Sequence, residues 1–173
     1  SASYLVGLLS ALHTLKGENV SRRHLAEEAY DIATGDLKLP DGKQDFYLAS
    51  FGNFCVLDIA KNGSVTVSNA DISKGVQNEF EKRTLLFYTG VRRSSTEILR
   101  EQEKHLRANK TDAMELKHAI KRIGRNILQV FESGELDKFG ALLDEHWNVK
   151  KKMSAKISTD NFDALYEKAT KEG

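Results

Sequence analysis

The segment 41–46, Asp-Gly-Lys-Gln-Asp-Phe, carries the side chain that we consider best suited to chemistry, the carboxylate of Asp45. Pro40, Asp41 and Gly42 lie a few residues before Asp45 and are typical of a turn. These residues alone therefore leave two interpretations open, an ordinary turn with a solvated carboxylate or a chemical site. The motifs on either side of the segment bear on the choice.

A second candidate site is the segment 89–95, Thr-Gly-Val-Arg-Arg-Ser-Ser, which follows an apolar run and precedes an expected helix. Guanidinium groups, hydroxyl groups and the N–H groups of a helix N-terminus all favour a phosphate or a carboxylate. The pattern thus fits an anion site. A helix cap with exposed arginines is the alternative that these residues leave open.

Several common site signatures do not occur in the sequence. Because it contains neither G-x-x-x-x-G-K-[ST] nor G-x-G-x-x-G nor G-x-S-x-G, a P-loop, a Rossmann site and a serine hydrolase are all disfavoured. The five histidines show no paired metal-ligand spacing, and with a single cysteine a zinc site has little support. Lysines 150–152 fit a solvated helix end, and Trp147 fits the core or a subunit contact.

The composition indicates a globular protein without a strong charge bias. The 173 residues are 40% apolar, and 26 lysines and arginines face 25 acidic residues. This balance disfavours a nucleic-acid or membrane-surface partner, so a bound anion has to be held locally. Cys55 lies in an apolar run and fits a reducing compartment. With no signal-peptide pattern and no run long enough to span a membrane, we predict a cytoplasmic location.

The hydropathy pattern predicts helices and a hairpin in the first part of the chain. We expect a helix over residues 2–16, a second helix that Ser21 caps and Gly35 stops, and a short helix over 44–50. Residues 54–59 and 65–67 are rich in β-formers and are joined at Asn62-Gly63, which is a strong hairpin signal.

The later part of the chain reads as mainly helical. We predict a connecting helix over 71–81 and a buried strand over 84–89 that Gly90 ends. Four helices should follow. Ser94 or Ser95 caps the first, Thr111-Asp112 caps the second, apolar residues line one face of the third over 136–147, and Ser158 caps the last. The fold class is therefore α+β. The shift in composition near residues 70–84 suggests two domains, which we place at 1–72 and 73–173.

Taken in order, four motifs resemble the GHMP small-molecule kinases, in particular the branch with the heptose 7-phosphate kinases. Residues 1–3, Ser-Ala-Ser, are similar to the end of the family's phosphate loop, and residues 42–52 to its G-x-Q-D-Q-Y-A-A-A-F-G segment. Residues 87–90 together with Arg93 resemble its F-Y-T-G-x-x-R segment, and residues 134–151 resemble its helical region. The resemblance extends over essentially all 173 residues.

This resemblance implies an ATP-dependent transfer of a phosphoryl group to a hydroxyl of a sugar or sugar phosphate, with ATP and Mg²⁺ as cofactors. Asp45 takes the position of the general base. Ser1, Ala2 and Ser3 take the position of the ATP phosphate site, with Ser1 also at the Mg²⁺. The residues implied for substrate binding are Gly42, Gln44, Thr89, Gly90 and Arg93. The resemblance assigns residues 1–72 to the later part of the family's N-terminal, ATP-binding domain and residues 73–173 to its C-terminal domain. It also suggests a homodimer as a possible assembly.

The chain departs from the family pattern at two positions and at both ends. Ala33 stands where the family has a Mg²⁺-binding glutamate, and Phe46 stands where it has a glutamine. The first family motif, most of the phosphate loop and a Gly-rich third motif are missing. We therefore expect a fragment that is inactive by itself. A non-catalytic module that binds a sugar phosphate or a protein, and a plain helical scaffold, are the alternatives.

Overall fold

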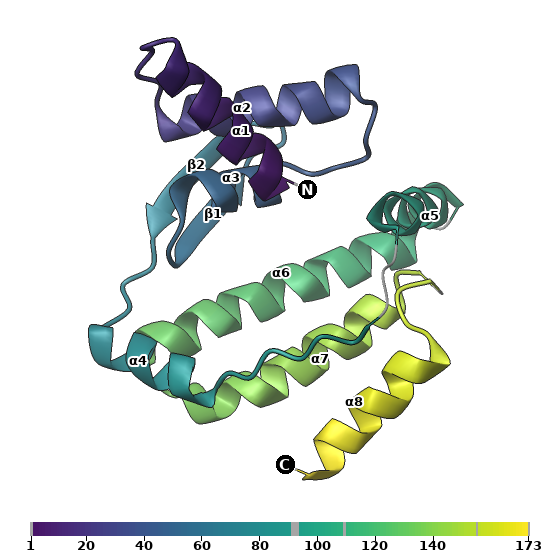
Figure 1. Ribbon diagram of the computed structural model, residues 1–173. Coiled ribbons are helices and arrows are strands. Elements are labelled where there is room, and N and C mark those ends of the chain that lie inside the picture. Colours follow the sequence, from purple (N-terminus) through teal and green to yellow (C-terminus); the bar gives the residue numbers. More distant parts are fainter. Residues whose placement is uncertain (1, 91–93, 109, 155, 173) are drawn as a thin grey trace. The chain divides into compact units, whose positions relative to one another are not determined.

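The computed structural model describes residues 2–90, 94–108, 110–154 and 156–172. The chain divides into two compact units, Ser1–Asp71, called unit 1 below, and Ile72–Gly173, called unit 2 (Figure 1). The predicted α+β class is confirmed, because the chain is mainly helical and contains one antiparallel hairpin among the described residues. None of the helices in these ranges is both long and apolar enough to cross a membrane.

Unit 1 begins with the predicted helices. Its elements are α1 (Ala2–Leu15), α2 (Arg22–Asp31), the π-helical turn η1 (Ile32–Asp36), α3 (Gln44–Phe51), β1 (Cys55–Ile59) and β2 (Val65–Asn69). Ser21 caps α2 as predicted, since its hydroxyl accepts a hydrogen bond from the backbone N–H of His24 at 3.1 Å. The predicted stop at Gly35 is wrong. The chain widens into η1 instead, with the N–H of Leu37 bonded to the carbonyl of Ile32 at 3.0 Å.

The predicted hairpin is confirmed. β1 pairs with β2 in antiparallel register, with Leu57 opposite Val67 and Ile59 opposite Val65. Gly63 has a φ of +81°, a backbone conformation that glycine adopts without a steric penalty. The Asn62 side chain accepts a hydrogen bond from the N–H of Ser64 at 3.0 Å. The Asn-Gly pair therefore closes the turn as its chemistry predicts.

A closed core holds unit 1 together. It comprises Val6 and Leu9 of α1, Ala26 and Ala29 of α2, Ala33 of η1, Phe46 and Tyr47 of α3, and Val65 of β2. The alanines on α2 and η1 are at most 2% exposed, and their small size allows neighbouring helix axes to approach closely. Phe46 and Tyr47 fill the space between the helices and the hairpin. Because these two aromatics are adjacent in sequence, they fix the orientation of α3.

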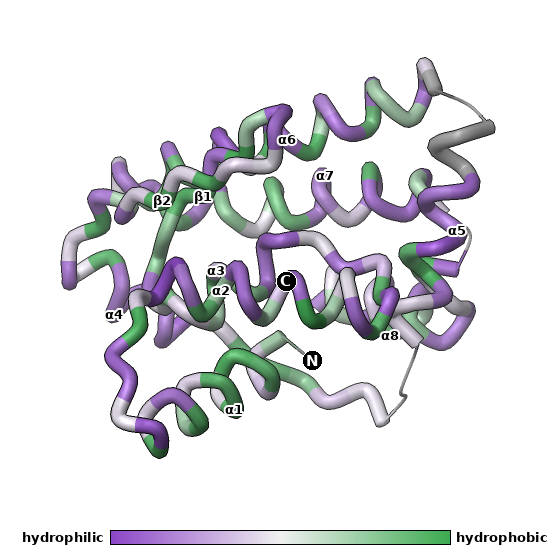
Figure 2. Tube along the Cα trace, turned by 90° about the horizontal axis from the view of Figure 1, so that it is seen from above, coloured by the Kyte–Doolittle hydropathy of each residue, from purple (hydrophilic) through white to green (hydrophobic). Residues whose placement is uncertain are grey.

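Unit 2 consists of helices. They are α4 (Lys74–Arg83), α5 (Ser95–Ala108), α6 (Lys110–Ser133), the short 3₁₀ turn η2 (Leu136–Lys138), α7 (Phe139–Lys151) and α8 (Asp160–Glu172). In Figure 1 α6 and α7 run side by side, and Figure 2 shows hydrophobic and hydrophilic residues alternating along α6, as expected for an amphipathic helix.

Three phenylalanines form the aromatic centre of unit 2. Phe80 of α4, Phe131 of α6 and Phe139 of α7 pack edge to face, with ring centroids 5.0 to 5.6 Å apart. This arrangement places the positive edge of one ring against the negative face of the next. The three rings join the helices on which they lie.

Two predicted helix caps in unit 2 are wrong. α6 begins at Lys110, so the predicted cap residues Thr111 and Asp112 lie inside its first turn. The last helix is capped by Thr159, whose hydroxyl accepts from the N–H of Phe162 at 3.4 Å. Ser158, the predicted cap, instead donates its hydroxyl to Asp163 at 2.9 Å.

The predicted buried strand over 84–89 is wrong. This segment has no regular secondary structure, and Leu85, Leu86, Phe87 and Tyr88 are between 76% and 99% exposed. A strand requires a neighbour with which to pair its N–H and C=O groups. The only sheet in the described part of the chain is the hairpin of unit 1, so the segment has no strand partner within its own unit.

Candidate functional site

Asp45 lies in the first turn of α3 and its side chain is exposed. It forms no hydrogen bond or ion pair with the residues that the structure describes. The next two residues, Phe46 and Tyr47, are buried at 2% and 0% exposure. Their packing holds the start of α3, and it therefore fixes the backbone of Asp45, whose carboxylate is open to solvent.

A salt bridge attaches the turn before Asp45 to α2. The ammonium of Lys43 donates to both carboxylate oxygens of Glu27, at 2.6 and 2.9 Å. The hydroxyl of Tyr47 donates to the same carboxylate. Lys43 also lies over the ring of Tyr30, 5.1 Å from its centroid. Two contacts thus fix the backbone on both sides of Asp45.

Arg23 extends this network to the hairpin. Its guanidinium donates to the carbonyl of Val65 at 2.6 Å and lies 5.9 Å from the centre of the Tyr47 ring. Sequence reasoning missed the roles of Arg23, Glu27 and Lys43. The pairing of Lys43 with Glu27 joins residues 16 positions apart in sequence, for which no local pattern gives a signal.

The network shifts the pKa values of two of its members. Burial alone raises the pKa of Glu27, but hydrogen bonds from Lys43 and Tyr47 outweigh burial and hold that pKa below its usual value. Burial, and then the hydrogen bond to Glu27, raises the pKa of Tyr47 to about 12. At neutral pH, therefore, Glu27 is an anion and Tyr47 is a neutral donor.

The other predicted site residues of unit 1 lie at helix starts or in the turn. Gly42 and Gln44 are exposed beside Asp45. Ala2 packs partly buried against the core, and Ser3 is exposed in the first turn of α1, a helix that packs against α3. Ser1 lies outside the described residues. The structure thus brings Gly42, Gln44 and Asp45 together in one turn.

The two departures from the family pattern are core residues. Ala33 and Phe46 are each 2% exposed, and Phe46 packs edge to face on Tyr30 with ring centroids 6.0 Å apart. A methyl group offers no metal ligand, so Ala33 does not fit the Mg²⁺ role that the resemblance assigns to this position. In contrast, the first turn of α1 fits a phosphate, because its N–H groups have no partner within the helix.

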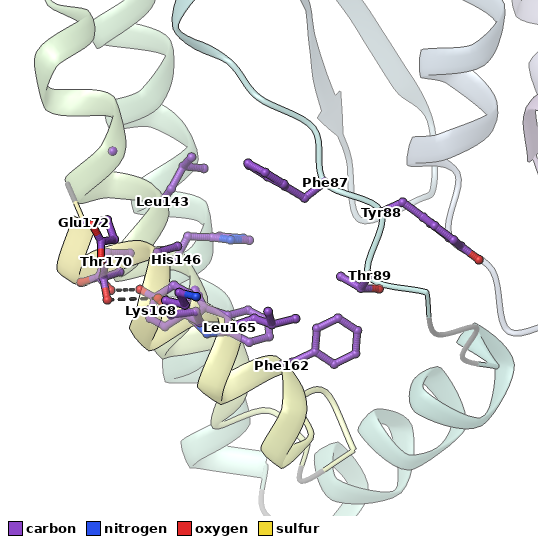
Figure 3. Close-up of a pocket in the computed structure, with 15 residues that line it drawn as sticks. Phe87, Tyr88, Thr89, Leu143, His146, Phe162, Leu165, Lys168, Thr170 and Glu172 are labelled. Carbon is purple, nitrogen blue, oxygen red and sulfur yellow. Dashed lines mark hydrogen bonds between the residues drawn. The ribbon is translucent and has the colours of Figure 1, made fainter.

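Unit 2 contains two of the predicted substrate residues, Thr89 and Gly90, whereas Arg93 lies outside the described residues. Thr89 lines an open cavity of about 870 Å³ between the segment 87–89 and helices α7 and α8 (Figure 3). Phe87 points toward Leu143 and His146, whereas Tyr88 points away from them. Gly90, just beyond, has a φ of +76°.

The walls of this cavity are mainly apolar and aromatic. Trp147 and Tyr166 lie 6.0 Å apart between ring centroids, and the hydroxyl of Tyr166 donates to Asp144. That hydrogen bond, followed by burial, raises the pKa of Tyr166 to about 12. Burial, followed by the charge of Lys150, lowers the pKa of His146. The cavity thus offers apolar contact with a few polar groups, a composition typical of small-molecule pockets.

The fold also brings together two histidines that their sequence spacing does not connect. His13 and His24 lie on α1 and α2, and their imidazole nitrogens lie with a carboxylate oxygen of Glu28 in one group of possible metal ligands. The only local signal is the spacing of His24 and Glu28, four residues apart on one helix face. His13 joins them through the packing of α1 on α2.

Comparisons with known proteins identify similar chains. No protein-family model matches this sequence. It is 27% identical over 173 residues to D-glycero-alpha-D-manno-heptose 7-phosphate kinase of Campylobacter jejuni subsp. jejuni serotype O:2, covering all of this chain and 50% of that protein. The chain thus spans about half the length of the curated relative that it matches.

Two solved structures are also similar. A D-glycero-D-manno-heptose 1-phosphate kinase from Bacteriodes thetaiotaomicron matches with a TM-score of 0.70 and 25% identity, over 87% of this chain and 42% of that one. A Campylobacter jejuni protein described as a sugar kinase matches with a TM-score of 0.66 and 26% identity, over 100% of this chain and 48% of that one. The resemblance to heptose-phosphate kinases that the motifs predicted is confirmed.

Proposed function

We propose that this chain is part of a cytoplasmic kinase that transfers the terminal phosphoryl group of ATP to a hydroxyl of a sugar or sugar phosphate. The observation that carries the proposal is the similarity of all 173 residues to a heptose 7-phosphate kinase. The substrate class is a heptose phosphate, by analogy with the named relatives. The proposed family is that of the GHMP kinases, on the motifs described above.

In this proposal Asp45 is the general base. The bond between the terminal phosphorus of ATP and its bridging oxygen breaks, a bond from that phosphorus to the sugar oxygen forms, and ADP leaves. The proton of the sugar hydroxyl passes to the Asp45 carboxylate, which is exposed and has no partner among the described residues. The salt bridge between Lys43 and Glu27 positions the turn, with the Nζ–Oε2 distance at 2.6 Å.

The remaining predicted residues take binding roles. Gly42 and Gln44 lie beside Asp45 and contact the sugar, and Thr89, Gly90 and Arg93 bind the sugar or its phosphate. Ser1, together with Ala2 and Ser3 in the first turn of α1, binds the phosphates of ATP, because a helix N-terminus favours an anion. Mg²⁺ neutralises phosphate charge in such reactions. Ser1 is its proposed ligand here, and Ala33 contributes none.

The test of Asp45 measures ADP release from ATP and Mg²⁺ in the presence of heptose 7-phosphate. The assay is run on the chain of 173 residues and on the complete product of its gene. We expect turnover in the complete product and none in the chain alone, which spans about half the length of the kinase that it matches. In the complete product Asp45→Asn should lower kcat by about 10²- to 10⁴-fold, the usual contribution of a general base.

The matched control is Asp41→Asn, which makes the same chemical change four residues away in the same turn. It should leave turnover within about twofold of the wild type, as expected for a surface substitution outside the site. Equal rates in the two variants would refute the role of Asp45. Robust turnover by the 173-residue chain would instead contradict the proposed inactivity and leave the assignment of Asp45 in place.

A second candidate function rests on the burial of Ala33 and Phe46. Because both are 2% exposed, the positions that carry polar side chains in the family serve here as core. This observation favours a non-catalytic module that binds a sugar phosphate or a protein partner. Calorimetry on the complete product of the gene separates the two functions: sugar-phosphate binding without Mg-ATP binding supports the module, whereas Mg-ATP binding supports the kinase.

A further inference from the structure

The connection between α1 and α2 places four ionisable side chains side by side. Gly17, with a φ of +74°, ends α1 in a Schellman motif, in which its N–H bonds to the carbonyl of Thr14 at 3.0 Å and the N–H of Glu18 bonds to that of His13 at 2.9 Å. This motif folds Glu18 back over His13. The Ser21 cap then starts α2 so that His24 lies in its first turn.

The four side chains, called the histidine cluster below, are His13, Glu18, His24 and Glu28. Nε2 of His13 lies 2.8 Å from Oε2 of Glu28, and Nε2 of His24 lies 3.6 Å from the same oxygen. One ligand atom from each of His13, His24 and Glu28 lies within 4.8 Å of the others. Lys16 pairs with Glu18 at 2.8 Å, but Asp31 and Asp36, which lie beside His24 and Glu28, have no ion-pair partner in the described part of the chain, so the local charge still favours a cation.

We propose that His13, His24 and Glu28 bind a divalent transition-metal ion, with Zn²⁺ as the best-fitting ion, and that Glu18 positions His13. Two imidazoles and one carboxylate are a ligand set that proteins use for Zn²⁺, with a fourth position left for water. This site is separate from the proposed kinase chemistry, since none of its members takes part in the Asp45 turn.

Two of the three distances between ligand atoms can be compared with those around such an ion, and the third, between His13 and His24, is at most 4.8 Å. Two ligand atoms that are each about 2.0–2.1 Å from one tetrahedral Zn²⁺ lie about 3.3 Å apart. The separation of His24 and Glu28 is 3.6 Å, close to this value, whereas that of His13 and Glu28 is 2.8 Å and has to lengthen. His24 is 57% exposed at its side chain and free to rotate toward the ion.

Glu18 supplies the outer contact that metal-binding histidines usually have. Its Oε2 lies 2.6 Å from Nδ1 of His13. Nε2 of the same ring is hydrogen-bonded to Glu28 at 2.8 Å in this structure, and metal binding replaces that bond. With Nδ1–H donated to Glu18, the lone pair of Nε2 can then point to the metal, and the plane of the ring is fixed. His13 is the least exposed of the four at 14%, so its ring is the fixed ligand about which the others assemble.

His24 and Glu28 also line an open polar groove of about 460 Å³. The other lining residues are Glu27, Asp31, Ile32 and Asp36. The fourth coordination position can therefore face solvent, which gives the ion a path to the site. The ion would join the last turn of α1 to α2, and it would add a link between the two helices that pack beside α3.

The experiment titrates the chain, without a histidine tag, with ZnCl₂ at pH 7 in a calorimeter. We expect one Zn²⁺ per chain and no saturable binding of Mg²⁺ to this site, because imidazole ligands suit transition metals. His24→Gln and Glu28→Gln should each weaken Zn²⁺ binding at least tenfold. His118→Gln, which removes an exposed histidine of α6, is the matched control and should bind like the wild type.

Glu18→Gln tests the positioning role and keeps all three ligands. It should weaken Zn²⁺ binding about 10- to 100-fold, as expected for loss of an outer-shell contact. The visible spectrum of bound Co²⁺ provides a second readout, which His24→Gln should abolish and His118→Gln preserve. Absence of saturable Zn²⁺ binding and of a Co²⁺ spectrum, or equal affinities in His24→Gln and His118→Gln, would overturn the proposal and leave an ordinary ion-pair cluster.

Discussion

Unit 1 and unit 2 bury their apolar side chains in different ways. In unit 1 three helices and a hairpin close around alanines and two adjacent aromatics, Phe46 and Tyr47. In unit 2 the three phenylalanines that join α4, α6 and α7 form a smaller centre, and the apolar segment 84–89 stays uncovered.

The difference concerns how firmly each candidate residue is held. Asp45 precedes two fully packed side chains and follows a lysine in a salt bridge, so its position is determined by the core of unit 1. Thr89 and Gly90 follow a segment whose side chains are mostly exposed, so packing within unit 2 does little to fix them. Packing therefore positions the proposed catalytic residue of unit 1 more firmly than the proposed binding residues of unit 2.

Replacing matched tyrosines tests the contrast most strongly. Tyr47→Ala removes a side chain that is 0% exposed, and it should lower the free energy of unfolding of unit 1 by about 3–5 kcal/mol, as for other large aromatics. Tyr88→Ala removes one that is 82% exposed, and it should change the stability of unit 2 by less than about 0.5 kcal/mol. Urea unfolding followed by circular dichroism measures both changes. Similar losses in the two variants would show that the contrast in burial is wrong.

Matched ion pairs give an intermediate effect. Glu27→Gln weakens the bonds from Lys43 and Tyr47, and because Glu27 is 33% and Lys43 19% exposed we expect a loss of about 1 kcal/mol in unit 1. The control is Glu79→Gln, which removes the exposed partner of Arg83 on α4 and should lower the stability less than Glu27→Gln does, because water screens this pair. A double-mutant cycle with Lys43→Met isolates the interaction free energy between Glu27 and Lys43. Zero coupling between Glu27 and Lys43 would contradict their role as an anchor.

The smallest effect is a dependence on pH in unit 2. Burial lowers the pKa of His146 below its ordinary value of 6.5, so the unfolded chain binds this proton more readily than the folded one. The contribution of neutral His146 to the free energy of unfolding is complete above pH 6.5. It is lost as the pH falls below that value toward the pKa of His146 in the folded chain. His146→Gln should therefore reduce the loss of stability between pH 7 and pH 5, measured by urea unfolding, and His118→Gln should not. If the stability of His146→Gln depended on pH as that of the wild type does, His146 would be excluded as a source of this pH dependence.

Local patterns predicted the helices and the hairpin because caps, periodicity and the Asn62-Gly63 turn act over a few residues. The strand over 84–89 was wrong, since strand propensity needs a partner that unit 2 does not supply in its described residues. The salt bridge between Lys43 and Glu27 could not be predicted, because it depends on how α3 packs on α2. The histidine cluster was missed for the same reason.

The candidate site shows the same limits. Family motifs located Asp45, and the structure places it exposed in the first turn of a well-packed helix. Its role as a base stays a prediction, as do the binding roles of Gly42, Gln44, Thr89 and Gly90. The motif comparison marked Ala33 and Phe46 as departures, but only the fold shows that both are core residues.

The uncovered segment 84–89 has a practical consequence for handling the chain. Its six residues, Thr-Leu-Leu-Phe-Tyr-Thr, carry no charge and no proline and have high β-propensity. Such six-residue segments can stack in register and form the dry interfaces of amyloid fibrils when they are exposed. Residues 84–89, which form no strand within one chain, can therefore pair as strands between neighbouring chains. A charged substitution at Leu86 should keep concentrated samples from forming such fibrils.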